Sequence, residues 1–138
     1  RRNSAKIMLN YLSKFDSEAK AEAIVEVHNS MATMSITYAN AVSSIQNIEA
    51  DGEDSLGNIF EIPATACAKF HAGLKSLDTS ECPNDYREAF SRLIKLVEKE
   101  KQALENENLF RFMENVTERK KLGDELKSIA VKHGLMFF

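Results

Sequence analysis

Residues 24–48 read IVEVHNSMATMSITYANAVSSIQNI, and this stretch decides the fold. Apolar residues recur in it at alternating intervals of three and four, which places them on one stripe of a continuous helix. The stripe consists of Ile24, Val27, Met31, Met34, Tyr38, Ala41, Ile45 and Ile48. We expect one helix from Ser17 to Ala50, capped by Asp16 or Ser17 and ended by Gly52. Such a helix cannot bury its own stripe, so the rest of the chain must cover it.

Two further helices are predicted to follow. An acidic loop, DGEDSLGN at residues 51–58, separates the long helix from one that starts at Pro63 and ends near Asp78. Pro83 opens the next helix, whose apolar face runs to Val97. Beyond it the run Glu98–Lys101 is expected to be exposed.

A fourth helix is predicted from about Val116 to His133, with Gly134 as its stop. A break at residues 105–108 and a connecting segment at 109–113 precede it. With 138 residues but only 5 Gly and 2 Pro, the chain has few turns. The predicted fold is therefore all-α: residues 1–138 form a single domain, an antiparallel up-down-up-down four-helix bundle with one long first helix.

Charge and hydropathy argue against two classes of partner. The formal net charge is −3, and the densest basic run, Arg119–Lys121, is flanked by acids, so no nucleic-acid partner is expected. No run approaches the roughly 20 apolar residues of a membrane span, so no transmembrane segment is expected. The first residue is Arg rather than Met, which predicts a processed or trimmed chain.

Motifs for catalysis or metal binding are not recognisable. Cys67 and His71 stand four apart on one helix face, but a zinc site needs further ligands and no second such pair exists. No G-x-S-x-G, HExxH or phosphate-loop pattern occurs. We therefore expect no catalytic, cofactor-binding or metal-binding residues, although an active site assembled from distant residues stays open.

The two cysteines, Cys67 and Cys82, are expected to remain unpaired. Cys82 stands at the turn between the second and third helices, and Cys67 lies about 15 Å from it along the helix axis, too far for a disulfide. Cys67 should be a buried thiol. Cys82 should be more exposed, at a helix start that favours its thiolate.

Two sets of residues are candidates for binding. Arg87 and Arg92 could hold an anionic ligand, with surface ion pairing as the alternative. Apolar residues beyond the needs of short connections could form a protein interface, and they predict a homo-oligomer or another protein partner. These residues are Leu109, Phe110, Phe112, Met113, Phe137 and Phe138.

Two segments resemble parts of small bacterial exported or lipoprotein-like helical proteins. They are CPNDYREAFSRLI at residues 82–94 and ELKSIAVKHGL at residues 125–135. The chain departs from that pattern after Ile94, where an aromatic residue is expected and Leu96-Val97 stands instead. The resemblance implies a bacterial protein of the periplasm or cell envelope and brings no established active site.

Three functions are therefore considered. The first is a non-enzymatic helical-bundle module that acts through protein–protein contact. The second is an extracytoplasmic four-helix sensor that binds a small ligand between its helices. The third is an enzyme with a dispersed active site.

Overall fold

The computed structural model of the chain describes residues 2–46 and 59–135, which form helices without a strand. The helices are α1 (Arg2–Gln46), α3 (Glu61–Ser76), α4 (Asn84–Glu105) and α5 (Leu109–Lys132). The all-α prediction is confirmed for this part of the chain. Outside it lie Ile48, the 51–58 loop with Gly52, Phe137 and Phe138.

Helix α1 is longer than predicted, because it passes through Asp16 without a break. The proposed cap at Asp16 or Ser17 is wrong: Asp16 lies within the helix, and its carboxylate pairs with Lys20 Nζ one turn later at 3.3 Å. The apolar stripe is confirmed. Its residues Ile24, Val27, Tyr38 and Ile45 are buried, and Met31, Met34 and Ala41 are half-buried.

Helices α3 and α4 begin close to the predicted prolines. Pro63 lies in the first turn of α3, and Pro83 immediately precedes α4. A proline at these positions costs no helical hydrogen bond, because the first N–H groups of a helix have no partner within it. The prolines therefore mark the start of each helix correctly to within two residues.

Helix α5 begins at Leu109, so the predicted start near Val116 is wrong. The side chain of Asn108 accepts a hydrogen bond from the backbone N–H of Arg111 at 3.1 Å and caps the helix. The apolar cluster 109–113 is therefore helical and does not form a connecting segment. The stop at Gly134, which has a φ of 94°, is confirmed.

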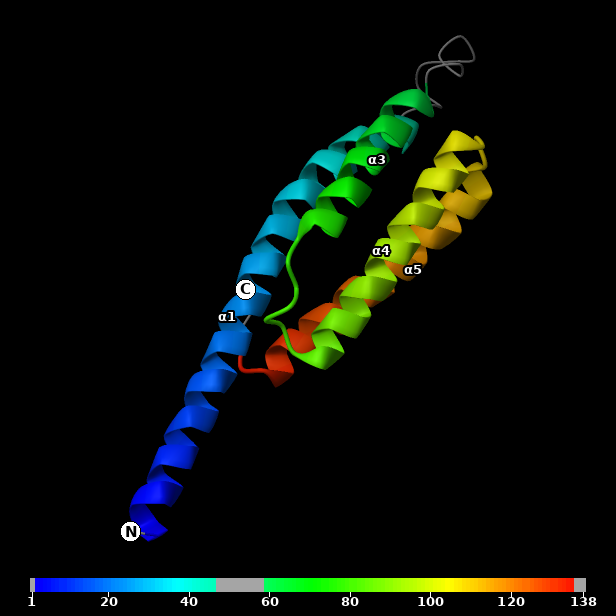
Figure 1. Cartoon of the computed structure of the whole chain (residues 1–138). Helices are drawn as coiled ribbons and strands as arrows, with labels where there is room; N and C mark the ends of the chain where they lie inside the picture. Colours follow the sequence, from blue (N-terminus) through cyan, green and yellow to red (C-terminus); the bar gives the residue numbers. More distant parts are fainter. Residues whose placement is uncertain (1, 47–58, 136–138) are drawn as a thin grey trace.

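Consecutive helices pack against one another: α1 on α3, α3 on α4, and α4 on α5 (Figure 1). Ion pairs show that α4 and α5 run in opposite directions. Residues further along α4 pair with residues nearer the start of α5. The pairs are Asp85–His133, Arg92–Glu125 and Glu100–Arg119. The N-terminal part of α1 extends past the ends of the other helices (Figure 1).

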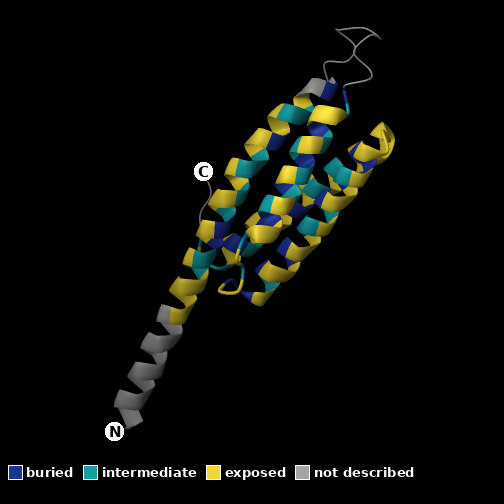
Figure 2. Ribbon diagram, turned by 45° about the horizontal axis from the view of Figure 1, so that its top comes forward, coloured by how far each residue is buried: buried dark blue, intermediate teal, exposed yellow. Residues whose placement is uncertain are grey.

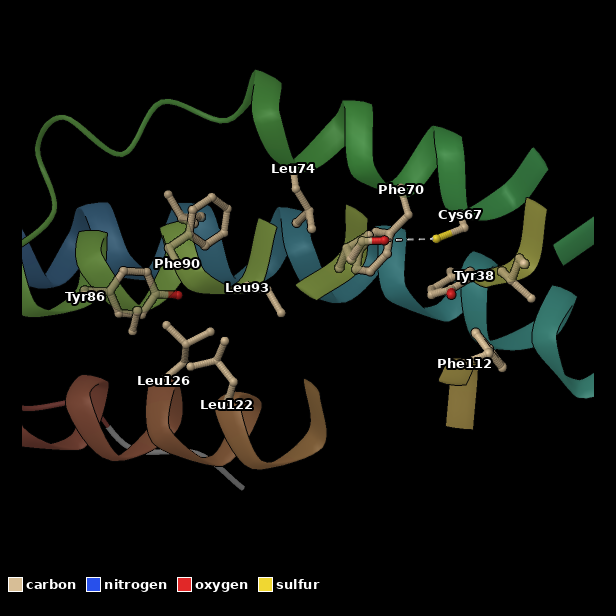
Figure 3. Close-up of a cluster of buried hydrophobic side chains, with 14 of the residues drawn as sticks. Tyr38, Cys67, Phe70, Leu74, Tyr86, Phe90, Leu93, Phe112, Leu122 and Leu126 are labelled. Carbon is tan, nitrogen blue, oxygen red and sulfur yellow. Dashed lines mark hydrogen bonds between the residues drawn. The ribbon is translucent and has the colours of Figure 1, made fainter. Parts of the chain in front are cut away.

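The core lies between the helices, whose outer faces are exposed (Figure 2). Leu74 of α3 and Leu126 of α5 point inward from opposite sides (Figure 3). At the other end of the cluster the rings of Tyr38 and Phe70 lie 5.2 Å apart, with Phe112 close by (Figure 3). None of the described helices is both long and apolar enough to cross a membrane.

Candidate functional site

Three of the predicted interface residues form an exposed apolar patch on the first turns of α5. Phe110 is 75% exposed, Met113 48% and Leu109 39%. Their spacing places them within about 100° of one side of the helix. We call these three residues the α5 patch. The patch lies beside the short α4–α5 turn (Figure 1), and the exposure of its side chains leaves it open to another molecule.

Phe112, which was also predicted at the interface, belongs to the core and is 0% exposed. It stands two positions after Phe110, about 200° around the helix, so the two rings point to opposite sides. Phe112 packs near Tyr38 inside the chain (Figure 3). The exposed surface therefore excludes it, whereas Phe137 and Phe138 lie outside the described residues.

Arg87 and Arg92 are not brought together by the fold. They stand five positions apart on α4, about 140° around the helix, and line different surface grooves. Arg92 is held by both carboxylate oxygens of Glu125, with Nη1 to Oε2 at 3.2 Å. Arg87 Nη1 donates to the carbonyl oxygen of Ser80 at 3.5 Å. The two guanidinium groups form no shared anion site, and ligand binding by either one stays a prediction.

A buried polar network joins α1, α4 and α5, and the sequence analysis missed it. Glu100 is 0% exposed, although the run Glu98–Lys101 was predicted to be exposed. Its Oε1 accepts a hydrogen bond from the Tyr38 hydroxyl at 3.1 Å, and its Oε2 lies 2.9 Å from Arg119 Nε. The Arg119 guanidinium carbon lies 5.4 Å from the centre of the Tyr38 ring, a cation–π contact.

The spacing along α4 was the signal that could have identified Glu100. The inward stripe of α4 advances by alternating steps of four and three. Its members are Tyr86, Phe90, Leu93, Val97, Glu100 and Leu104, all buried. A charged residue at such a position needs a buried partner, because an unpaired charge in a core is strongly destabilising.

Burial sets the protonation of the groups in this region. Burial raises the pKa of Glu100, while the charge of Arg119 and the hydrogen bonds from Arg119 and Tyr38 act against the rise. Burial raises the pKa of the Cys67 thiol to about 12. The Cys67 Sγ donates to the carbonyl oxygen of Val97 at 3.5 Å (Figure 3). Cys67 is therefore a protonated core thiol at neutral pH and not an activated nucleophile.

Both cysteines are free and unpaired, as predicted, and Cys67 is buried. The predicted exposure of Cys82 is wrong, because this residue is only 4% exposed. Its backbone N–H donates to the carbonyl oxygen of Thr79 at 2.9 Å, within the turn before α4. Burial raises the pKa of Cys82 and outweighs the opposing charge of Arg87, so the predicted thiolate is not favoured.

Two hollows lie beside α1. A groove of about 470 Å³ runs between α1 and α3, with Met34, Ile62, Ala66 and Phe70 among its lining residues. A cavity of about 290 Å³ lies between α1 and α5, bordered by Arg119. Across residues 2–46 and 59–135, no three His, Cys, Asp or Glu side chains are grouped to hold a metal ion.

No family model, curated protein or solved structure matches the chain. Function therefore has to be argued from the chain's own residues. The features of the chain that bear on function are the α5 patch, the buried network around Glu100 and the two hollows beside α1.

Proposed function

We propose that the chain is an antiparallel up-down-up-down four-helix bundle that acts by protein–protein contact and carries out no catalysis of its own. The bundle is supported by the contacts between consecutive helices and by the opposite directions of α4 and α5. The contact surface is the α5 patch. The location of the protein in the bacterial cell envelope stays a prediction, because it rests on the resemblance of segments 82–94 and 125–135 to bacterial exported proteins.

The exposure of Phe110 carries this proposal. A phenylalanine that is 75% exposed leaves most of its ring in water, and burying such a ring contributes about 1.5–3 kcal/mol. Single exposed apolar residues are common on protein surfaces, but Leu109 and Met113 share this face with Phe110. Three large apolar side chains on one helix face favour a contact with a second copy of the chain or with another protein.

Substitution of Phe110 tests the contact in its simplest form, self-association. We expect the wild-type chain to sediment as a dimer or larger oligomer at high micromolar concentration. Phe110→Ser should weaken that association about tenfold or more, because 1.4 kcal/mol corresponds to a factor of ten. Sedimentation velocity over a range of concentrations measures this change.

Val131→Ser is the matched control, because Val131 is also exposed and apolar on α5 but lies far along the helix from the patch. It should associate as the wild type does. A wild-type chain that stays strictly monomeric at high micromolar concentration, or an equal loss of association in both variants, would contradict self-association through the α5 patch.

A second candidate function is small-ligand binding, favoured by the groove between α1 and α3. Its volume of about 470 Å³ lies within the range of ligand pockets, and its lining is mostly apolar. A thermal-shift screen of small apolar compounds tests it, because a ligand of the native state must raise the melting temperature. A Thr65→Glu variant, altered in the groove wall, should lose the shift, whereas Thr33→Glu on the exposed side of α1 should keep it.

A further inference from the structure

The cavity between α1 and α5 shares no residue with the α5 patch and opens to solvent beside the exposed residues Ala32 and Lys127. Its volume is about 290 Å³. Gly123 of α5 forms part of its wall, and a Cβ atom added to Gly123 would meet no atom within 4 Å. The α1 side of the wall includes Ala32, another small residue. The space beside Gly123 is therefore open and is not filled by packed side chains.

Apolar side chains from all four helices supply the inner wall. Met31 comes from α1, Phe70 from α3, Leu93 from α4 and Leu126 from α5. Phe70, Leu93 and Leu126 are buried, and all three belong to the cluster drawn in Figure 3. A ligand in this cavity would meet the hydrocarbon surface of the core, so its body has to be apolar.

The polar part of the wall is basic. The polar lining residues are His28, Ser35, Arg119 and Lys127, and no Asp or Glu is among them. The charge of Arg119 is partly balanced by Glu100, 2.9 Å from its Nε, so Lys127 contributes most of the positive potential. Arg119 uses Nε for both of its hydrogen bonds to Glu100. The N–H groups on the two terminal nitrogens of Arg119 take no part in this ion pair. Because Glu100 and the Tyr38 ring hold the guanidinium in place, these N–H groups are already oriented before a ligand arrives.

The electrostatics of His28 agree with a positive potential at this wall. Burial lowers the pKa of His28, and the charge of Lys127 lowers it further. Burial disfavours a charge of either sign, so only the smaller cause, the positive charge of Lys127, also favours an anion at this wall.

We propose that the cavity binds an organic monocarboxylate with an apolar body, its carboxylate at Arg119 and Lys127 and its hydrocarbon part against Leu93 and Leu126. One carboxylate matches the planar fork of a single arginine. The modest volume, about 290 Å³, is at the lower limit of known ligand pockets, which selects a short or medium-length acid. This inference uses none of the α5 patch and stands independently of protein contact.

Isothermal titration calorimetry with octanoate and with octanamide tests the charge requirement. The two probes share their hydrocarbon chain and differ in the carboxylate. We expect saturable binding of one octanoate per chain, and at least tenfold weaker binding of octanamide. Absence of saturable octanoate binding, or equal affinity for the two probes, would overturn the proposal.

Charge-reversal variants test the location of the carboxylate. Lys127→Glu should lower octanoate affinity at least fivefold, because it places a negative charge in the cavity wall. Lys95→Glu is the matched control: Lys95 is exposed on α4 and does not line the cavity, and the substitution changes the net charge equally. It should leave the affinity within twofold of the wild type. An equal loss in both variants would show only a general effect of net charge and would overturn the site.

Gly123→Met tests the cavity itself. The new side chain would enter the open space beside Gly123, so the protein should stay folded, with unchanged helical circular dichroism, and should lose octanoate binding. A folded Gly123→Met variant that binds octanoate as the wild type does would place the ligand elsewhere, for example in the α1–α3 groove, and would overturn the assignment.

Discussion

At the residue scale, Glu107 in the turn between α4 and α5 adopts a φ of 55°, in the left-handed region. The turn is closed by hydrogen bonds from Asn108 N–H to Ala103 O at 2.8 Å and from Glu107 N–H to Leu104 O at 3.1 Å. This helix ending normally has glycine at the left-handed position, and a residue with a Cβ costs about 1–2 kcal/mol there. We expect Glu107→Gly to raise the free energy of unfolding by about 1 kcal/mol, measured by urea denaturation.

Glu98→Gly provides the contrast for that prediction. Glu98 is exposed within α4, where glycine is unfavourable, so this variant should lose about 1 kcal/mol. If both glycine variants are destabilised to the same extent, the turn does not depend on the left-handed conformation of residue 107.

Asp85 is the residue for which a pH dependence is expected. Its carboxylate lies 3.0 Å from His133 Nε2 and 3.6 Å from Lys132 Nζ. Burial raises the pKa of Asp85, but hydrogen bonds from His133 and the Tyr86 N–H, with the charges of His133 and Lys132, outweigh it and lower the pKa below 3.8. The pKa of Asp85 is lower in the folded chain than in the unfolded chain. The ionised carboxylate therefore stabilises the fold above pH 3.8, and this stabilisation is lost as the pH falls through the folded pKa.

We therefore expect Asp85→Asn to lower the free energy of unfolding by about 0.5–1 kcal/mol at mildly acidic pH, a small value because the pair is partly exposed. The difference from the wild type should disappear in strong acid. Urea titrations across the acid range measure it. Asp124→Asn, at an exposed position of α5, should show no such pH-dependent difference, and an equal response from it would remove Asp85 as the cause.

At the scale of elements, two helical glycines should respond to alanine to different extents. At Gly123 of α5 an added Cβ meets nothing within 4 Å, whereas at Gly73 of α3 it would lie 2.3 Å from the Sδ of Met34 on α1. Alanine is favoured over glycine in a helix by about 1 kcal/mol. Gly123→Ala should therefore gain about that amount, whereas Gly73→Ala should gain clearly less, because the flexible Met34 side chain must first move aside.

The double variant Gly73→Ala/Met34→Ala separates the contact from an intrinsic effect of residue 73. In a Met34→Ala background the obstacle is removed, so adding Gly73→Ala should gain the full helix-propensity amount of about 1 kcal/mol in thermal or urea unfolding. Strictly additive effects of the two substitutions would contradict the proposed close contact between α1 and α3.

At the scale of the whole molecule, the network of Tyr38, Glu100 and Arg119 fixes how α1 meets the α4–α5 pair. Removing one partner leaves the other without compensation inside the protein. We expect Arg119→Met to lower the free energy of unfolding by about 3 kcal/mol or more, since breaking a buried pair costs about 3–5 kcal/mol.

The double variant Glu100→Met/Arg119→Met should recover most of that loss, because two apolar side chains of similar volume need no partner. Denaturant titrations of the two single variants, the double variant and the wild type give the coupling energy. A double variant as unstable as the sum of the singles would show that Glu100 and Arg119 do not act as a pair.

The sequence by itself determined the helices that have a regular apolar face and a clear start. The three-four spacing from Ile24 to Ile45 predicted the buried side of α1, and Pro63 and Pro83 marked where α3 and α4 begin. These features are local, because the helical period and the missing N–H of proline act within a few residues. Asn108 was placed in a break and 109–113 in a connection, whereas in the structure the Asn108 side chain caps α5 and these residues are helical.

Only the tertiary structure decided which polar groups are buried and which apolar groups remain outside. Glu100 is fully buried although its run was predicted to be exposed, and Phe112 is fully buried although it was predicted at the interface with Phe110, which is exposed. The cavity between α1 and α5 likewise depends on residues from all four helices. Glu100 accepts a hydrogen bond from the Tyr38 hydroxyl, 62 positions away, and its charge is paired with that of Arg119, 19 positions away. Whether a charge can be buried depends on such partners, and helix packing brings them within hydrogen-bond distance.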